Sequence, residues 1–210
     1  GRYAYGNQPA IAQWNLARLA DALLPLIDAD AESAAQRAGA AVEAFAERFD
    51  FHWTSVLRLK LGLDGSSGDD RALADDYLKL MSQYRIDFTL AFARLADAAQ
   101  GNDTPLRALF GGTGAALELW LKRWRERTQA VGTSQVELAA ALRSANPIYI
   151  PRNHHVEAAL AAAVERDNLA PFERLLRVLE HPFDEHPADI SLAEPAPAEL
   201  TENYRTFCGT

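Results

Sequence analysis

The chain has 210 residues, a length that fits one large domain or two small ones. Its 29 acidic and 21 basic residues give a formal net charge of -8, which disfavours nucleic acid and anionic membranes as partners because like charges repel. No apolar run approaches the ~20 residues that span a bilayer, so we expect neither nucleic acid nor membrane among its partners.

The single cysteine indicates the redox environment of the protein. Cys208, third from the end of the chain, is the single cysteine, so no internal disulfide can form. This indicates a reducing compartment, or a thiol kept for chemistry rather than for structure. The sequence starts with Gly1 rather than Met and shows no leader-like segment, and we expect it to be a piece of a longer protein.

The composition predicts an all-α fold. Alanine, leucine, glutamate and arginine dominate, and β-branched residues never alternate over the length of a strand. The first helix is expected to begin near Pro9 with Asn7 as its cap, because these residue types suit the first turn and the N-cap. A broad apolar stripe should run along this helix, with Trp14 to one side; it comprises Ile11, Leu16, Leu19, Leu23, Leu26 and Ile27.

Two more helices are predicted before the first loop. Asp30 is suited to cap the second helix, in which apolar residues recur every three or four positions. A third, short helix is expected from Trp53 to Leu61. It should end at Gly62, which can adopt the left-handed conformation that closes helices. The polar segment 62–70 predicts a flexible connection.

The middle of the chain continues the helical pattern. One long helix or two abutting helices are expected between Leu73 and Leu95, with a break before Leu106. The helix that follows carries two tryptophans. Ser134 and Glu137 then have the spacing of a capping box, in which each side chain bonds the backbone N–H of the other.

The last predicted helices are bounded by proline and asparagine. Asn146, followed by a proline, should halt the capped helix at about residue 144. Asn153 can cap a helix that runs to about Arg166. Pro171 suits the first turn of a final helix, which should end before Pro182.

The remaining residues are rich in prolines and acids and predict an extended tail from Asp184 onward. We therefore expect two parts. A helical domain covers residues 1–183, and an extended tail at 184–210 carries Cys208.

Histidines occur in two groups that could bind a metal ion. His154 and His155 are adjacent, whereas metal-binding pairs on helices need a spacing of three or four. His181, Asp184 and His186 lie in a proline-bounded turn and could hold a divalent ion, although a solvated turn is several times more common. We predict no metal-binding residues in this chain.

Two other motifs have both a functional and a structural interpretation. FGGTG at 110–114 has the glycines of a phosphate loop, but a helical pattern precedes it and no Lys-Ser or Lys-Thr follows. Trp120 and Trp124 stand among arginines that could help stack nucleic-acid bases, yet Glu118 and Glu126 interrupt the positive charge. A helix connection and an amphipathic helix with buried indoles are the stronger predictions.

The sequence contains none of the catalytic motifs that we searched for. There is no GxSxG motif, no CxxC pair and no recognisable Cys-His arrangement. We therefore predict no catalytic, cofactor-binding or metal-binding residues, and Cys208 stands as the one candidate functional residue.

Three separate segments nevertheless resemble one family. They are the opening GRYAYGNQPAIAQWNLARLADALLPLI, the stretch NPIYIPRNHHVEAAL with the later FERLLRVLEHPFDE, and the ending YRTFCGT. All three resemble segments of the selenoprotein O (SelO) family in the order found there, strongly over 1–27 and 146–185 and less over 65–133. Members of this family are protein adenylyltransferases with a kinase-like fold, which transfer AMP from ATP to Ser, Thr or Tyr hydroxyls with loss of pyrophosphate.

The resemblance implies that the catalytic machinery lies outside this chain. In family members the nucleotide-binding residues, the catalytic aspartate and the metal-binding Asn and Asp all precede the segment GRYAYGNQP. ATP and Mg²⁺ or Mn²⁺ are therefore expected as cofactors of the parent protein and none for this segment, which should be inactive alone. The expected partners are the upstream catalytic lobe of the same protein and protein substrates, in the bacterial cytoplasm.

The resemblance also suggests a role for Cys208. The corresponding terminal residue of the family is implicated in redox control, through a disulfide to a cysteine of the activation-segment region. Since this chain has no second cysteine, the partner thiol would lie upstream of Gly1 or on another molecule. The alternative is an inert, exposed thiol.

A second class of function stays open, that of a stand-alone helical interaction module without catalysis. In either case the apolar stripe of the first helix should be exposed once the upstream lobe is removed. Such a surface could support a homodimer of the isolated segment.

Overall fold

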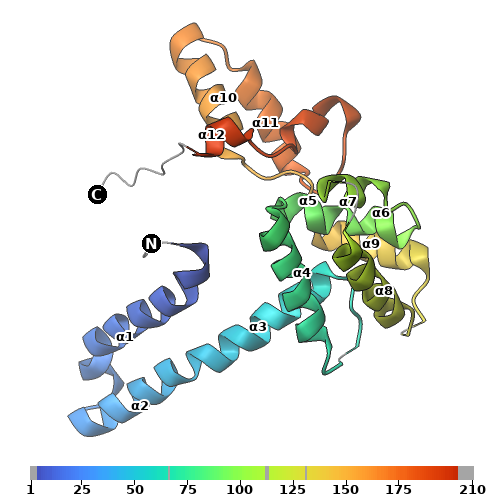
Figure 1. Ribbon diagram of the computed structural model, residues 1–210. Helices are drawn as coiled ribbons and strands as arrows, with labels where there is room; N and C mark the ends of the chain where they lie inside the picture. Colours follow the sequence, from blue (N-terminus) through green and yellow to red (C-terminus); the bar gives the residue numbers. More distant parts are fainter. Residues whose placement is uncertain (1–3, 66, 112–113, 131, 203–210) are drawn as a thin grey trace. The chain divides into compact units, whose positions relative to one another are not determined.

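The computed structural model describes residues 4–65, 67–111, 114–130 and 132–202 (Figure 1). These residues form helices joined by turns, with no strand among them, so the predicted all-α fold is confirmed. Of the helices described, none is both long and apolar enough to cross a membrane. The chain divides into two compact units, Gly1–Leu57 (unit 1) and Arg58–Thr210 (unit 2).

Unit 1 is built from long helices, of which α1 and α2 lie side by side (Figure 1). Asp30 caps α2 as predicted, because its side chain accepts a hydrogen bond of 2.8 Å from the N–H of Ser33. Asn7 stands at the N-cap position of α1, but its side chain makes no capping hydrogen bond there. The elements of unit 1 are η1 (Tyr5–Asn7), α1 (Gln8–Ile27), α2 (Ala31–Glu43) and most of α3 (Phe45–Lys60).

The boundary between α2 and α3 differs from the prediction. The second helix ends at Glu43 with Ala44 as its C-cap, and α3 begins at Phe45 rather than at Trp53. Phe45, Phe49 and Trp53 then stack along one face of α3, with ring centroids 6.0 and 6.1 Å apart. These aromatic residues follow the same helical period on both sides of the boundary, so the pattern of apolar residues alone could not locate it.

Unit 2 consists of helices of 5 to 15 residues. The predicted helix or helix pair between Leu73 and Leu95 is interrupted at 85–87, where Arg85 closes α4 in the left-handed conformation and Asp87 caps α5, and again at Arg94 between α5 and α6. The elements of unit 2 are α4 (Asp70–Tyr84), α5 (Phe88–Ala93), α6 (Leu95–Ala99), α7 (Thr104–Leu109), α8 (Ala115–Gln129), α9 (Gln135–Ala145), α10 (Asn153–Arg166), α11 (Ala170–Glu180), η2 (Pro187–Leu192) and α12 (Ala198–Glu202).

The core of unit 2 is centred on the two tryptophans of α8. Trp120 and Trp124 are buried, as predicted, and their rings stack with centroids 6.0 Å apart. Tyr77 of α4 stacks on Trp120 at 4.0 Å. The indole N–H of Trp120 donates to the carbonyl of Leu73, and that of Trp124 donates to the carbonyl of Leu61, both at 2.8 Å. The buried indoles therefore fix the start of α4 and the end of α3 while filling the core.

Several predicted helix ends are confirmed. Gly62 has a φ of 63°, and a Cβ there would lie only 2.5 Å from a methyl carbon of Leu138. Ser134 and Glu137 form the capping box at the start of α9. The start of α10 differs by one residue, because Asn153 is its first helical residue and Arg152 occupies the N-cap position.

The segment after Asp184 is not extended in its described part. Pro187 starts the 3-10 helix η2, and the short helix α12 follows. Leu192 and Ala193 are buried in a cluster with residues of the 148–149 segment and of α11. Arg174 of α11 donates to Asp189 at 2.6 Å and holds η2 in place. The prolines suggested an extended chain, but the few apolar residues between them suffice to dock the segment on unit 2.

Candidate functional site

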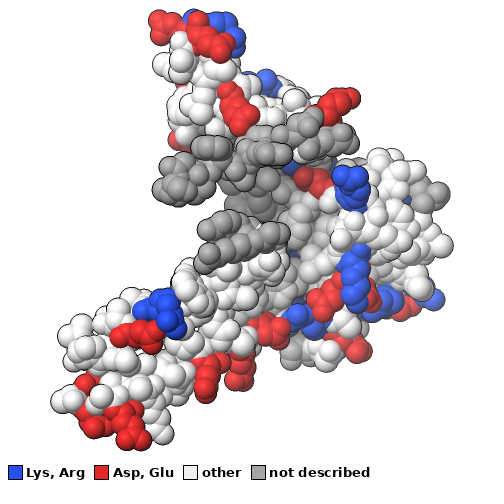
Figure 2. All heavy atoms as spheres, turned by 60° about the vertical axis from the view of Figure 1, so that its left-hand side comes forward, with Lys and Arg blue, Asp and Glu red and all other residues white. Residues whose placement is uncertain are grey.

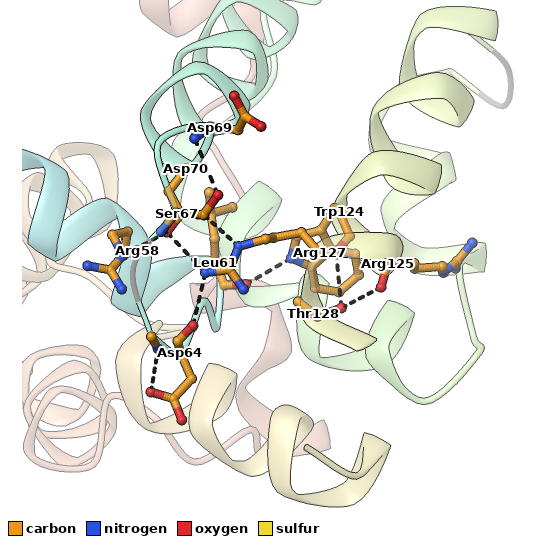
Figure 3. Close-up of polar contacts among 11 residues, drawn as sticks. Arg58, Leu61, Asp64, Ser67, Asp69, Asp70, Trp124, Arg125, Arg127 and Thr128 are labelled. Atoms are coloured by element: carbon orange, nitrogen blue, oxygen red, sulfur yellow. Dashed lines mark hydrogen bonds and ion pairs between the residues drawn. The ribbon is translucent and has the colours of Figure 1, made fainter. Parts of the chain in front are cut away.

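A buried carboxylate joins three helices of unit 2 (Figure 3). Asp70, at the start of α4, is 2% exposed. Its two oxygens accept hydrogen bonds from Arg127 of α8, at 2.7 Å from Nε and 3.1 Å from Nη2. Arg58, near the end of α3, places its Nε 3.0 Å from the same carboxylate. The backbone N–H of Ser67 donates to it at 3.1 Å.

This arrangement is suited to holding the helices together. A buried charge is costly unless it is paired and hydrogen-bonded, and Asp70 meets both conditions. Arg127 also donates to the backbone carbonyl of Asp64 at 2.9 Å, so the loop before α4 is attached at two points. Both carboxylate oxygens already accept hydrogen bonds within the chain, and we interpret the cluster as structural.

The sequence analysis missed this cluster, although a signal was present. Arg127 lies seven residues after Trp120 and three after Trp124, which places it on the same face of α8 as the buried indoles. An arginine on a buried face indicates an acidic partner. The partner itself, Asp70, stands in a polar stretch that looks like an ordinary loop.

The stretch that begins at Asn146 also has a structural role at its start. The side-chain amide of Asn146, which is 3% exposed, donates to the carbonyls of Lys60 and Leu142 at 2.9 and 3.0 Å. Lys60 returns a bond of 3.3 Å to Asn146 Oδ1, and its ammonium lies 5.5 Å from the ring centre of Phe92. Burial lowers the pKa of Lys60. The ends of α3 and α9 are thereby joined.

Arg152 and Asp87 form a second buried ion pair. Arg152 is 9% exposed and donates from both terminal nitrogens to the two oxygens of Asp87, at 2.8 and 2.9 Å. Burial acts to raise the pKa of Asp87, but the hydrogen bonds from Arg152 and from the N–H of Leu90 outweigh it, so that pKa lies below its usual range. The pair ties the start of α5 to the start of α10.

The adjacent histidines lie in the first turn of α10. The rings of His154 and His155 are 3.9 Å apart, and His155 Nε2 lies 3.2 Å from the carbonyl of Ser191 in η2. Burial lowers the pKa of both imidazoles. The charge of Arg152 adds to the effect at His154, and the charge of His154 adds to it at His155. The two rings therefore pack against each other as neutral groups near pH 7.

A hollow of about 440 Å³ opens beside these residues, between the start of α10 and α12. Arg152 is the basic residue in its lining, and both of its terminal nitrogens are already bonded to Asp87. A phosphate group placed there would meet a neutralised ion pair. The hollow therefore does not fit the triphosphate of a nucleotide.

The histidines and the glycine-rich motif that were considered as metal or phosphate ligands form no such site in the described residues. In the part of the chain that the structure describes, no group of three or more His, Cys, Asp or Glu side chains could hold one metal ion. His181 and His186 are included in that statement. The FGGTG motif follows the helix α7 rather than a strand, and its residues 112–113 lie outside the described part. The described residues thus fit neither a divalent metal ion nor a phosphate loop.

Cys208, the candidate redox residue, also lies outside the described residues, which end at Glu202. Its predicted role stays a prediction that the structure does not test.

Comparison with known proteins shows where the chain belongs. The family model described as "Protein adenylyltransferase SelO" matches residues 1–180. The chain belongs to the SelO family. The structural elements described above, from α1 to α11, therefore form part of a SelO protein.

Curated relatives match along the whole chain. Proteins named "Protein nucleotidyltransferase YdiU" are 52% identical in Cereibacter sphaeroides, 51% identical in Chromobacterium violaceum and 46% identical in Rhizobium etli. Each match covers 100% of this chain but only 42%, 44% and 42% of the respective relative. The matched region is the C-terminal part of these relatives. The chain thus spans about two fifths of the length of the SelO proteins it matches.

Proposed function

We propose that this chain is the C-terminal helical part of a bacterial protein adenylyltransferase, which transfers AMP from ATP to Ser, Thr or Tyr hydroxyls of other proteins. The observation that carries the proposal is the match to the SelO family over residues 1–180, together with relatives of about 50% identity that are named protein nucleotidyltransferases. The bacterial cytoplasm, where ATP is present, is the proposed location.

Within that protein the role of this part is to support the catalytic portion rather than to bind the nucleotide. The described residues form buried ion pairs and a hydrogen-bonded indole core, and they fit neither a metal site nor a phosphate site. ATP and Mg²⁺ or Mn²⁺ would therefore be bound by the portion that corresponds to the unmatched part of the relatives. That portion and the protein substrates are the proposed partners.

The test compares the complete protein with this 210-residue chain. The complete protein, incubated with labelled ATP and Mg²⁺ or Mn²⁺, should attach AMP to protein hydroxyls. The chain alone should attach none, and calorimetric titration should show no saturable ATP binding. An active 210-residue chain would place the nucleotide site within it. Failure of the complete protein to transfer AMP to any acceptor would overturn the proposed activity.

A regulatory role for Cys208 is proposed as well, and it rests on the resemblance of the ending YRTFCGT to the C-terminus of the family. Mild oxidation of the complete protein should change AMP transfer, and reduction should restore it, because a regulatory disulfide must form and break readily. The Cys208→Ser variant should lose this response. An equal response in the variant would show that another residue is responsible.

A further inference from the structure

Helix α1 presents three different faces. One face lies on α2, where Gln13 donates to the carbonyl of Val42 at 3.2 Å. A second face is polar at its centre, where Arg18 pairs with Asp21 at 3.1 Å and lies over the ring of Trp14. The third face is an exposed apolar stripe; its members are Leu16, Leu19, Leu23 and Leu26, which are 41%, 53%, 38% and 83% exposed.

The spacing of this stripe makes it a single surface. Its four leucines follow one another at intervals of three, four and three residues, which is the period of one helix face. A helix that is apolar on two adjacent faces normally packs against two neighbours. In unit 1, α2 supplies only one of them. In the view of Figure 2, most of the visible surface of α1 and α2 is uncharged.

Unit 1 also has little core of its own. Among its described residues, the buried apolar side chains are Ala34, Ala38 and Leu57, and none of them belongs to α1. Buried apolar surface has to offset the conformational entropy that is lost when each residue is ordered. Because unit 1 buries so few apolar side chains fully, a further partner surface would stabilise it.

The missing neighbour can be identified from the extent of the matched relatives. The chain covers their C-terminal part, and more than half of each relative precedes the matched region. That preceding polypeptide is part of the same chain in these relatives, which keeps it at high effective concentration near α1.

We propose that the stripe of Leu16, Leu19, Leu23 and Leu26 is the surface on which the preceding catalytic portion of the protein docks. The inference rests on the proposed function, since it requires the longer protein. The docking surface opposite the stripe must be apolar and uncharged, because the stripe itself carries no charged side chain.

The first test uses substitutions in the complete protein. Leu19→Asp and Leu23→Asp each place a charge in the proposed apolar interface and should lower AMP transfer about tenfold or more, because an unpaired charge is costly to bury. Leu119→Asp is the matched control, because Leu119 of α8 is 63% exposed and lies outside unit 1. Its activity should stay within about twofold of the unchanged protein. Equal effects of the three substitutions would overturn the proposal.

The second test needs no substitution and decides the matter if the variants fail to fold. Hydrogen exchange is measured for the amides of α1 in the complete protein and in the 210-residue chain. Docking predicts at least about tenfold slower exchange in the complete protein. Equal protection in both would mean that a second copy or another part of this chain covers the stripe, and would overturn the proposal; light scattering then identifies a dimer. If the complete protein protects α1 but transfers no AMP, the docking stands and the proposed activity fails.

Discussion

The two units of this chain use their apolar residues in opposite ways. Unit 2 buries the large indole side chains of Trp120 and Trp124 and pairs each indole N–H with a backbone carbonyl. Unit 1 has long helices with few buried residues, and the leucines of α1 remain exposed. Both units have the same helical periodicity in the sequence. The difference shows that an amphipathic pattern predicts which face of a helix will be buried, but does not identify the surface that buries it.

Unit 2 should therefore respond strongly to single substitutions, and unit 1 of the isolated chain only weakly. The largest effect is expected for Asp70→Ala. This change leaves Arg58 and Arg127 without their shared carboxylate and should lower the free energy of unfolding of unit 2 by about 3–5 kcal/mol. Urea unfolding of the 210-residue chain measures it.

The control for this prediction is Asp76→Ala. Asp76 pairs with Arg123 at the surface, at 2.8 Å, and its loss should cost about 1 kcal/mol or less. Similar losses for the two variants would mean that the buried cluster has no special role in holding α3, α4 and α8 together.

A smaller difference in stability loss is expected between substitutions of a tryptophan in unit 2 and one in unit 1. Trp124→Phe removes the donor to the carbonyl of Leu61, and the unpaired buried carbonyl should cost about 1–3 kcal/mol. Trp53→Phe in unit 1 keeps an aromatic ring beside Phe49 and should cost about 0.5 kcal/mol or less. Differential scanning calorimetry of both variants compares them, and a larger loss for Trp53→Phe would contradict the division into a packed and an unpacked unit.

The stability of unit 2 should depend on pH through the protonation of His154 and His155. The pKa values of His154 and His155 in the folded chain lie below the 6.5 of an unfolded chain. The unfolded state therefore binds protons first, so stability is complete above about pH 7 and falls as the pH drops through 6.5. The loss of stability ends at the lower pH at which both imidazoles are protonated in the folded state as well.

Unfolding by urea at pH values between 5 and 7.5 measures this loss. The double variant His154→Gln/His155→Gln should have a flatter profile over the same range. An unchanged slope would show that other groups titrate there.

The smallest effect is expected for Leu23→Asp in the isolated chain. Leu23 is exposed among the described residues, so the free energy of unfolding of unit 2 should change by about 0.5 kcal/mol at most. The same substitution is expected to be damaging in the complete protein. A large destabilisation of unit 2 in the isolated chain would show that the stripe is already in use there.

The sequence predicted those features that depend on neighbouring residues. The caps at Asp30 and at Ser134, the left-handed Gly62 and the buried face of α8 all follow from local chemistry or helical period. The start of α3 could not be located, because its aromatic residues continue the pattern of the preceding helix.

Features that depend on distant residues were not predictable. The partners in the Asp70 cluster are 12 and 57 positions away in the chain, and those in the Asp87–Arg152 pair are 65 positions apart. Nothing local marks such pairs as partners. The docking of Leu192 and Ala193 was missed for the same reason, because their neighbours in the core come from Leu90 and from residues 148–178.

The placement of the tryptophans makes the protein an optical reporter of its own unfolding. Trp120 and Trp124 are shielded from water, whereas Trp14 is half-exposed. The fluorescence of Trp120 and Trp124 should therefore shift to longer wavelength when unit 2 unfolds, with little change from Trp14. Because Trp14 shares the polar face of α1 with Arg18, away from the leucine stripe, its emission should also change little when the stripe is covered, and it can serve as an internal reference.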